Sequence, residues 1–207
     1  MMIASALSLS RADCKALALT DAYGLHKLVY SLFPEQDGRK RDFLYVDKGG
    51  DWNCRRILLL SARRPKTPEF GVIESREIQE SFLHKDYYAF EVTVNPTRRN
   101  GPSRTTTPIR GRDNLHNWFM QKSSVWGFAV DPDSLHIRNM GVVSFGRENG
   151  VTQTHGSATF VGKLQVTNRE AFVYSFKNGV GRAKGFGFGL LQIVPLQKQE
   201  NLNTKEE

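Results

Sequence analysis

The feature that most constrains the fold of this chain is a glycine-rich segment near its C-terminus, Asn178–Leu191, with the sequence NGVGRAKGFGFGLL. Its glycines permit a tight turn and let backbone amides approach a phosphate, while its two cations add positive charge. The segment has neither the strand-to-helix order of the dinucleotide-binding pattern nor the Gly-Lys-Ser/Thr of the P-loop. It is therefore either an anion-binding loop or a turn whose glycines are purely structural. The residues that would contact an anion are Gly179, Gly181, Arg182 and Lys184.

The balance of charge favours a polyanionic partner. The chain has 207 residues with 29 Lys and Arg against 21 Asp and Glu, which gives a formal charge of +8. Basic residues also flank the predicted strand at 55–62, and further candidate RNA contacts fall on an acid-free stretch: Arg98, Arg99, Arg104, Arg110 and Arg112. Such clusters neutralise phosphates without reading sequence, although a charged cluster is also typical of an ordinary solvated face. Nucleic acid is the favoured partner.

Composition excludes several other classes of protein. Only Cys14 and Cys54 occur, far apart and outside any Cys/His cluster, which argues against a disulfide scaffold or a zinc ribbon. No apolar run approaches the roughly 18–20 residues of a membrane span, and the first ten residues lack the basic region of a signal peptide. We expect a cytoplasmic protein with no membrane partner, no metal and no cofactor.

The first part of the chain shows the order strand, helix, strand, strand. Apolar residues alternate over 3–10, and a helix capped by Thr20 or Asp21 is predicted to run to Phe33, before Pro34. Strands follow at 41–46 and 55–62, joined by a glycine turn at 49–51, and 72–78 is a further candidate. This order is typical of a ferredoxin-like unit.

A second unit of the same kind begins near residue 85. Its predicted elements are a strand at 88–94, a solvated loop or hairpin at 97–112, a helix at 113–122, strands at 126–130, 135–145 and 157–166, a helix capped by Asn168 to 176, a turn at 179–185 and a strand at 186–194. The predicted class is α+β, with two tandem ferredoxin-like (RRM-like) domains at 1–84 and 85–197 and a polar tail at 198–207.

The first predicted helix carries a candidate catalytic pair. Tyr23 and His26 are three residues apart on the arc opposite the apolar one, so their side chains are neighbours on a face that we expect to point outward. A neutral imidazole exchanges a proton near pH 7, and RNA supplies its own nucleophile in the 2′-hydroxyl. Lys27 could provide the cation that the developing phosphorane charge needs. A solvated helix face with an ordinary histidine is the alternative interpretation.

Taken together, these segments resemble the CasE group of CRISPR-associated repeat-RNA endoribonucleases of type I-E systems. The resemblance rests on five segments in order: the N-terminal strand, Tyr23–His26 with the following Leu32–Pro34, Arg41–Tyr45, Leu59–Ala62 and the glycine loop Gly179–Leu191. It implies two ferredoxin-like domains with a basic cleft that holds the stem-loop of a CRISPR repeat.

The resemblance also implies a mechanism. The precursor crRNA would be cleaved without a metal, through attack by the 2′-hydroxyl, leaving a 2′,3′-cyclic phosphate and a 5′-hydroxyl. His26 would transfer the proton and Tyr23 would position the 2′-hydroxyl. Some members carry a lysine one turn further along the helix, where this chain has Ser31, which leaves Lys27 as the candidate cation. The enzyme would keep its crRNA and join a surveillance complex.

The residues alone leave two other classes of function open. One is a non-catalytic RNA-binding subunit of a CRISPR ribonucleoprotein, in which the basic cleft remains and the Tyr23–His26 pair is incidental. The other is a metal-dependent nuclease, which the lack of a carboxylate cluster disfavours.

Overall fold

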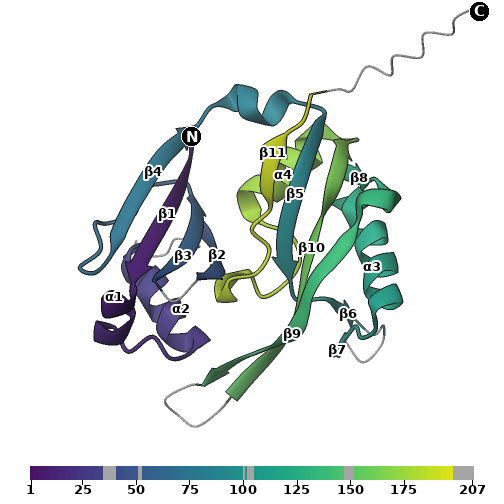
Figure 1. Cartoon of the computed structure of the whole chain (residues 1–207). Helices are drawn as coiled ribbons and strands as arrows, with labels where there is room; N and C mark the ends of the chain where they lie inside the picture. Colours follow the sequence, from purple (N-terminus) through teal and green to yellow (C-terminus); the bar gives the residue numbers. More distant parts are fainter. Residues whose placement is uncertain (35–40, 51–52, 100, 102–104, 147–151, 198–207) are drawn as a thin grey trace, which may run out of the picture.

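The computed structural model describes residues 1–34, 41–50, 53–99, 101, 105–146 and 152–197. Within them the chain forms two antiparallel sheets that stand side by side as neighbouring lobes, the first purple to blue and the second teal to yellow in Figure 1. No helix of the described residues is long and apolar enough to cross a membrane. The α+β architecture is as predicted.

The first sheet has the strand order of a ferredoxin-like unit. Its strands pair antiparallel in the order β2-β3-β1-β4. The usual second crossover helix is absent, because residues 62–71 connect β3 to β4 without one. The elements are β1 (Met2–Ser10), α1 (Arg11–Ala16), α2 (Ala22–Ser31), β2 (Phe43–Gly50), β3 (Cys54–Ser61) and β4 (Val72–Ile78).

Local sequence explains these elements. The odd-numbered side chains of β1 are buried, with Ile3, Leu7 and Leu9 fully so, as the alternation predicted. Asp21 caps α2, its Oδ1 accepting a 2.8 Å hydrogen bond from the Gly24 amide. The short helix α1, which the sequence analysis did not predict, begins with a capping box in which Ser10 and Asp13 satisfy each other's backbone amides.

The second sheet repeats this order with both helices present. Its strands run β11-β5-β10-β8, and the long strand β9 also pairs with β10. The elements are η1 (Glu80–His84), β5 (Tyr87–Val94), β6 (Thr97–Arg99), β7 (Thr106–Pro108), α3 (Arg112–Val125), β8 (Phe128–Val130), η2 (Pro132–Ser134), β9 (His136–Gly146), β10 (Thr152–Val166), α4 (Arg169–Asn178), η3 (Lys184–Phe186) and β11 (Gln192–Pro195). Thr97–Arg112 is thus largely the β6–β7 hairpin, one of the two predicted forms.

The predicted strand at 186–194 is wrong over its first six residues. Only Gln192–Pro195 pair with β5, and the glycine loop continues to Leu191. Gly187 and Gly189 both have φ near +84°, which lies outside the strand region and favours glycine. The backbone therefore turns at each glycine instead of extending.

The two sheets share a hydrophobic core. One face of the first sheet packs on α2, while Leu44, Val46 and Leu60 on its other face join the cluster that holds Tyr88 and Phe172 of the second unit. The domain bounds of 1–84 and 85–197 remain a prediction, and the tail at 198–207 lies outside the described residues.

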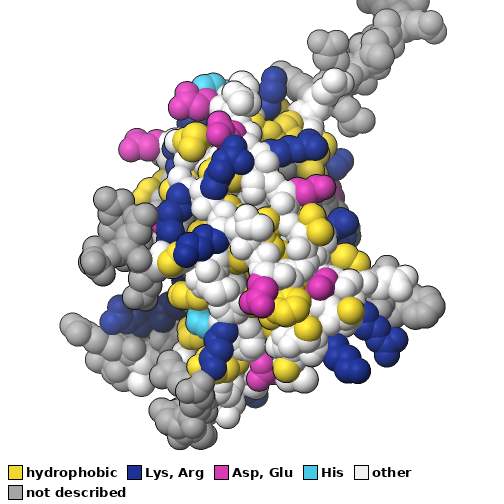
Figure 2. Space-filling model, turned by 90° about the vertical axis from the view of Figure 1, so that its left-hand side faces the viewer, with side chains coloured by type: hydrophobic (Ala, Val, Ile, Leu, Met, Phe, Trp, Pro, Cys, Tyr) yellow, Lys and Arg dark blue, Asp and Glu magenta, His cyan; other side chains and the backbone are white. Residues whose placement is uncertain are grey.

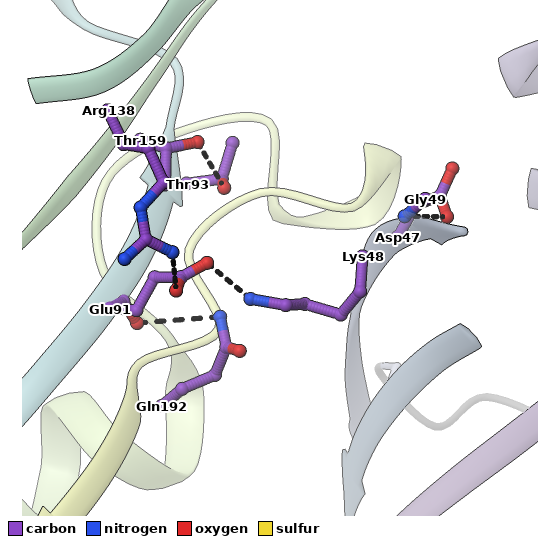
Figure 3. Close-up of polar contacts among 8 residues, drawn as sticks. All are labelled: Asp47, Lys48, Gly49, Glu91, Thr93, Arg138, Thr159 and Gln192. Atoms are coloured by element: carbon purple, nitrogen blue, oxygen red, sulfur yellow. Dashed lines mark hydrogen bonds and ion pairs between the residues drawn. The ribbon is translucent and has the colours of Figure 1, made fainter. Parts of the chain in front are cut away.

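A polar contact also joins the sheets at Glu91 of β5 (Figure 3). One carboxylate oxygen pairs with Lys48 of β2, and the other accepts a 2.9 Å hydrogen bond from Arg138 of β9. The Gln192 side chain approaches the Glu91 carbonyl oxygen at 3.5 Å. The carboxylate is only 23% exposed, so this contact fixes β2 against the second sheet better than an open surface pair would.

Candidate active site

The glycine loop lies against α2 and holds the imidazole of His26. The Nδ1 atom of His26 is 3.0 Å from the carbonyl oxygen of Gly185, 159 positions away in the chain. Because a carbonyl oxygen only accepts, the ring proton must sit on Nδ1. In the neutral ring Nε2 therefore carries no proton and is the acceptor. A general base requires this protonation state.

Aromatic rings surround this imidazole. The ring centroid of His26 is 4.1 Å from that of Tyr30, 5.4 Å from that of Phe186 and 6.2 Å from that of Tyr23. Tyr23 and His26 are thus neighbours, as their spacing predicted. The face predicted to point outward is only partly exposed, because Phe186 and Gly185 of the glycine loop cover part of it, and Tyr23, His26 and Tyr30 are half-buried.

Burial keeps His26 neutral at pH 7. Desolvation is the main cause that lowers the pKa of His26 below its usual 6.5, and the charge of Arg41 lowers it further. The hydrogen bond to Gly185 opposes both effects. The imidazole is then available as a proton acceptor at physiological pH.

Arg41 is a cation of this site that the sequence analysis did not assign. A Cβ atom on Gly185 would lie 2.5 Å from Nη1 of Arg41 and 3.2 Å from the Tyr30 hydroxyl, so the glycine leaves room for both groups. Arg41 is exposed, and its guanidinium also lies 5.9 Å from the Phe43 ring. The group could therefore meet a phosphate beside His26.

No local pattern could have found Arg41 and Phe186 as neighbours of His26, because both meet α2 only through tertiary packing. Tyr30 lies four residues after His26 on the same helix, a spacing that does predict neighbouring side chains. The one available signal was the RDFLY segment that begins at Arg41, which the resemblance used as a strand marker.

Lys27 and Lys184 supply two further cations. The Lys27 ammonium lies 4.6 Å from the centre of the Tyr23 ring, so it interacts with the tyrosine of the predicted pair. Lys184 approaches the Gly179 carbonyl oxygen at 3.4 Å, and burial, followed by the charge of Arg41, lowers its pKa. Both lysines therefore lie on elements that also form the His26 site.

The other predicted RNA contacts are spread along the second unit. Arg182 is exposed and donates a 2.7 Å hydrogen bond from Nη1 to the Thr106 hydroxyl. Arg112 donates to the Ile137 carbonyl oxygen at 3.1 Å, so part of its guanidinium is used by the fold. Arg98, Arg99 and Arg110 are exposed on or beside the β6–β7 hairpin, and Arg104 lies outside the described residues.

The two glycines predicted to contact RNA are also required by the backbone conformation of the loop. Gly179 and Gly181 have φ of +76° and +74°, and a Cβ on Gly179 would come within 2.9 Å of Leu44 and 3.0 Å of the Gly189 carbonyl oxygen. These observations fit the purely structural interpretation of the loop at Gly179. At Gly181 the nearest atom would be 3.7 Å away, which leaves space beside its backbone.

The arginines around β3 are largely held by acids. Arg55 pairs with Asp47 at 2.6 Å and Arg63 pairs with Asp42 at 2.7 Å. On the face turned to the viewer in Figure 2, Lys and Arg side chains are scattered among apolar and uncharged ones and form no continuous patch. The charge of Arg41 acts on both His26 and Lys184, so these three groups lie close to one another.

The donor set at this site suits acid–base chemistry on a phosphate. Among the described residues, no group of three or more His, Cys, Asp and Glu side chains is arranged to hold a metal ion. An imidazole whose Nε2 is the acceptor, tyrosine hydroxyls and nearby cations can move a proton and stabilise a developing negative charge.

Comparison with known proteins identifies the family. A family model described as CRISPR associated protein matches residues 2–195, and the chain belongs to this family. The chain is 25% identical over 189 residues to the CRISPR system Cascade subunit CasE of Escherichia coli (strain K12), covering 85% of this chain and 93% of that protein. The resemblance to the CasE group noted from the sequence is thereby confirmed.

Solved structures share the fold. Thermus thermophilus Cse3 bound to an RNA representing a pre-cleavage complex has a TM-score of 0.79 at 17% identity, covering 94% of this chain and 99% of that chain. Cas6e from Escherichia coli str. K-12 has a TM-score of 0.63 at 19% identity, covering 95% and 100%. Together with the strand orders above, these similarities confirm the tandem ferredoxin-like fold.

Proposed function

We propose that this chain is a cytoplasmic endoribonuclease that binds the stem-loop of a CRISPR repeat and cleaves precursor crRNA. One observation carries the proposal: the glycine loop holds His26 through Nδ1, which leaves Nε2 as a base beside the cation Arg41. The names of the relatives support it, since Cse3 is called a CRISPR endoribonuclease and CasE a Cascade subunit. By the same support, the product crRNA stays bound and enters a surveillance complex.

In the proposed reaction, His26 Nε2 takes the proton from a ribose 2′-hydroxyl. The 2′-oxygen bonds to the adjacent phosphorus, the bond from phosphorus to the 5′-oxygen breaks, and that oxygen takes up a proton from water, while protonated His26 returns its proton to solvent. The products are a 2′,3′-cyclic phosphate and a 5′-hydroxyl. Tyr23 positions the 2′-hydroxyl, and Lys27, Arg41 and Lys184 stabilise the charge that develops on the phosphate. Because RNA supplies the nucleophile, holding it in line provides much of the rate.

Arginines and glycines beyond this centre, together with Lys184 of the centre itself, are proposed to bind the RNA. Side chains of the β6–β7 hairpin and of the glycine loop neutralise phosphates of the stem. An RNA helix has a deep, narrow major groove lined with phosphates, which an arginine-rich hairpin can contact along its edges. The proposed contacts are Arg98, Arg99, Arg104, Arg110, Arg112, Gly179, Gly181, Arg182 and Lys184.

Cleavage in the presence of EDTA tests this function directly. We expect the protein to cut its repeat RNA at one position in excess EDTA, at the rate seen without it, because no step needs a metal. Mass spectrometry of the fragment ends should show a 2′,3′-cyclic phosphate. Binding without a cut would favour the non-catalytic subunit, and a cut abolished by EDTA and restored by Mg²⁺ would favour the metal-dependent nuclease.

The pH dependence of cleavage tests the protonation state of His26. The reaction needs the neutral imidazole, and its pKa is lowered, so activity is lost only as pH falls through a value below 6.5. We expect the acid limb of the kcat/KM profile for repeat RNA to lie below pH 6.5. Arg41→Gln should move that acid limb to higher pH, because the Arg41 charge contributes to lowering the pKa of His26. A wild-type limb above 6.5 with unchanged RNA affinity would contradict the assignment.

A further inference from the structure

A groove of about 860 Å³ runs between the β6–β7 hairpin and the β9 and β10 strands, beside the His26 site. Asn95, His155, Arg182 and Phe186 contribute to its lining. Asn95 follows the end of β5, His155 lies near the start of β10, and the other two residues come from the glycine loop. Three segments that are distant in sequence therefore meet in one concave surface.

Two polar atoms in this groove have no partner among the described residues. A hydrogen bond of 3.1 Å joins Asn95 Nδ2 to His155 Nδ1, and because the amide nitrogen donates, the proton of the neutral imidazole sits on Nε2. The Nε2 atom of His155 and the Oδ1 atom of Asn95 are both buried, and no described residue forms a hydrogen bond with either. Asn95 is only 7% exposed. Buried polar groups are normally paired, so this donor and this acceptor indicate a place where a ligand completes the structure.

The absence of a side chain at Gly156 leaves space beside the Asn95 amide. A Cβ on Gly156 would meet only Asn95 Oδ1, at 3.9 Å, so no side chain fills the position between the strand and the amide. Burial lowers the pKa of His155, which keeps its ring neutral and able to donate from one nitrogen. Beside them Arg182, anchored on Thr106 at 2.7 Å, brings a cation to the groove.

Phe186 connects the groove to the catalytic cluster. Its ring centroid is 5.0 Å from that of His155 and 5.4 Å from that of His26. The groove is thus separated from the proposed base by a single aromatic side chain. A chain of nucleotides that places one phosphate at His26 would bring a neighbouring nucleotide to His155.

We propose that this groove is a nucleotide-binding subsite, in which a base flanking the scissile phosphate hydrogen-bonds to Asn95 and His155 and a backbone phosphate pairs with Arg182. The inference rests on the proposed function, because the scissile phosphate defines its position. An acceptor beside a donor, as on the Watson–Crick edge of an unpaired base, matches His155 Nε2–H and Asn95 Oδ1. The ligand is therefore single-stranded RNA next to the stem.

Abasic substitutions in the RNA test the subsite on the wild-type protein. Each nucleotide flanking the cut is replaced in turn by a ribose without a base, and both Kd and the single-turnover cleavage rate are measured. We expect one flanking position at which loss of the base weakens Kd or slows cleavage by about tenfold, since a recognised base contributes on that scale. No effect at any flanking position would overturn the proposal.

The variant His155→Phe identifies the protein side of the contact. It keeps an aromatic ring against Phe186 and removes the Nε2 donor. Thermal unfolding of the variant is measured to check that it folds. In this variant, removing the recognised base should weaken Kd or slow cleavage by less than about twofold, instead of about tenfold as in the wild type. His136→Phe, at an exposed histidine of β9 outside the groove, should keep the full penalty. An equal penalty in wild type and His155→Phe would overturn the assignment.

The binding measurement separates this proposal from the proposed function. If wild-type protein binds repeat RNA without cutting it, the endoribonuclease assignment fails, while a base-dependent Kd that vanishes in His155→Phe still supports the subsite. If the RNA is cut and every flanking base is dispensable for both Kd and rate, the subsite fails and the endoribonuclease assignment stands.

Discussion

His26→Ala is expected to slow single-turnover cleavage of the repeat hairpin by about 10²–10⁴-fold, the usual contribution of general acid–base catalysis. The Nε2 atom is the proposed base, and the ring is oriented for that role by the Gly185 carbonyl oxygen at 3.0 Å. The rate is measured with excess protein, so that product release does not limit it. The same preparation should bind the hairpin with a Kd within about threefold of wild type, because phosphate contacts from other residues dominate affinity.

His26→Gln separates the chemistry from the packing. Its side-chain amide can still donate to Gly185, but it offers no basic nitrogen, so we expect a rate loss as large as that of His26→Ala. Replacement of the exposed His84 by Ala is the matched control and should leave the rate unchanged. Undiminished cleavage by either His26 variant would remove His26 from the mechanism and favour a different base.

Much of the fold could be predicted because its elements are encoded locally. The alternation in β1 and the apolar arc of α2 with its Asp21 cap follow from neighbouring residues alone. The same locality explains why Tyr23 and His26 could be paired from sequence, since residues three apart on a helix share a face.

The glycine loop shows where local patterns fail. Phe186, Phe188 and Leu190 alternate with glycines, which is also the period of a half-buried strand. In the structure Phe188 and Leu190 are buried by a loop that turns at glycines of positive φ. Tertiary contacts decide between the two conformations, and no period-2 pattern contains that information.

The rest of the site could not be predicted because it is built by contacts between distant segments. The Gly185 carbonyl oxygen reaches α2 across 159 positions, and Arg41 enters beside it because Gly185 has no side chain. Sequence supplied the proposed base and its tyrosine, whereas the group that orients the base and the cation beside it appear only once the chain is folded.

Gly189→Ala is expected to lower the free energy of unfolding by about 3 kcal/mol, combining the cost of positive φ with that of overpacking. Gly189 has φ of +84°, and a Cβ there would lie 2.2 Å from the backbone oxygen of Val180, which cannot move aside as a flexible side chain could. For a chain of this length the change corresponds to a fall in Tm of roughly 6–12 °C by thermal unfolding.

The same substitution should also reduce cleavage at temperatures where the variant is folded. Gly189 holds the loop at two points, its amide donating to the Thr93 carbonyl oxygen at 2.7 Å and its own carbonyl oxygen accepting from Val180 at 2.9 Å. Displacing it shifts the loop that carries Gly185 and so loosens the imidazole of His26. Gly146→Ala, where a Cβ would meet nothing within 4 Å and which lies outside the groove, should change neither Tm nor rate. A Gly189→Ala protein with wild-type Tm and wild-type cleavage would show that the loop does not position the base.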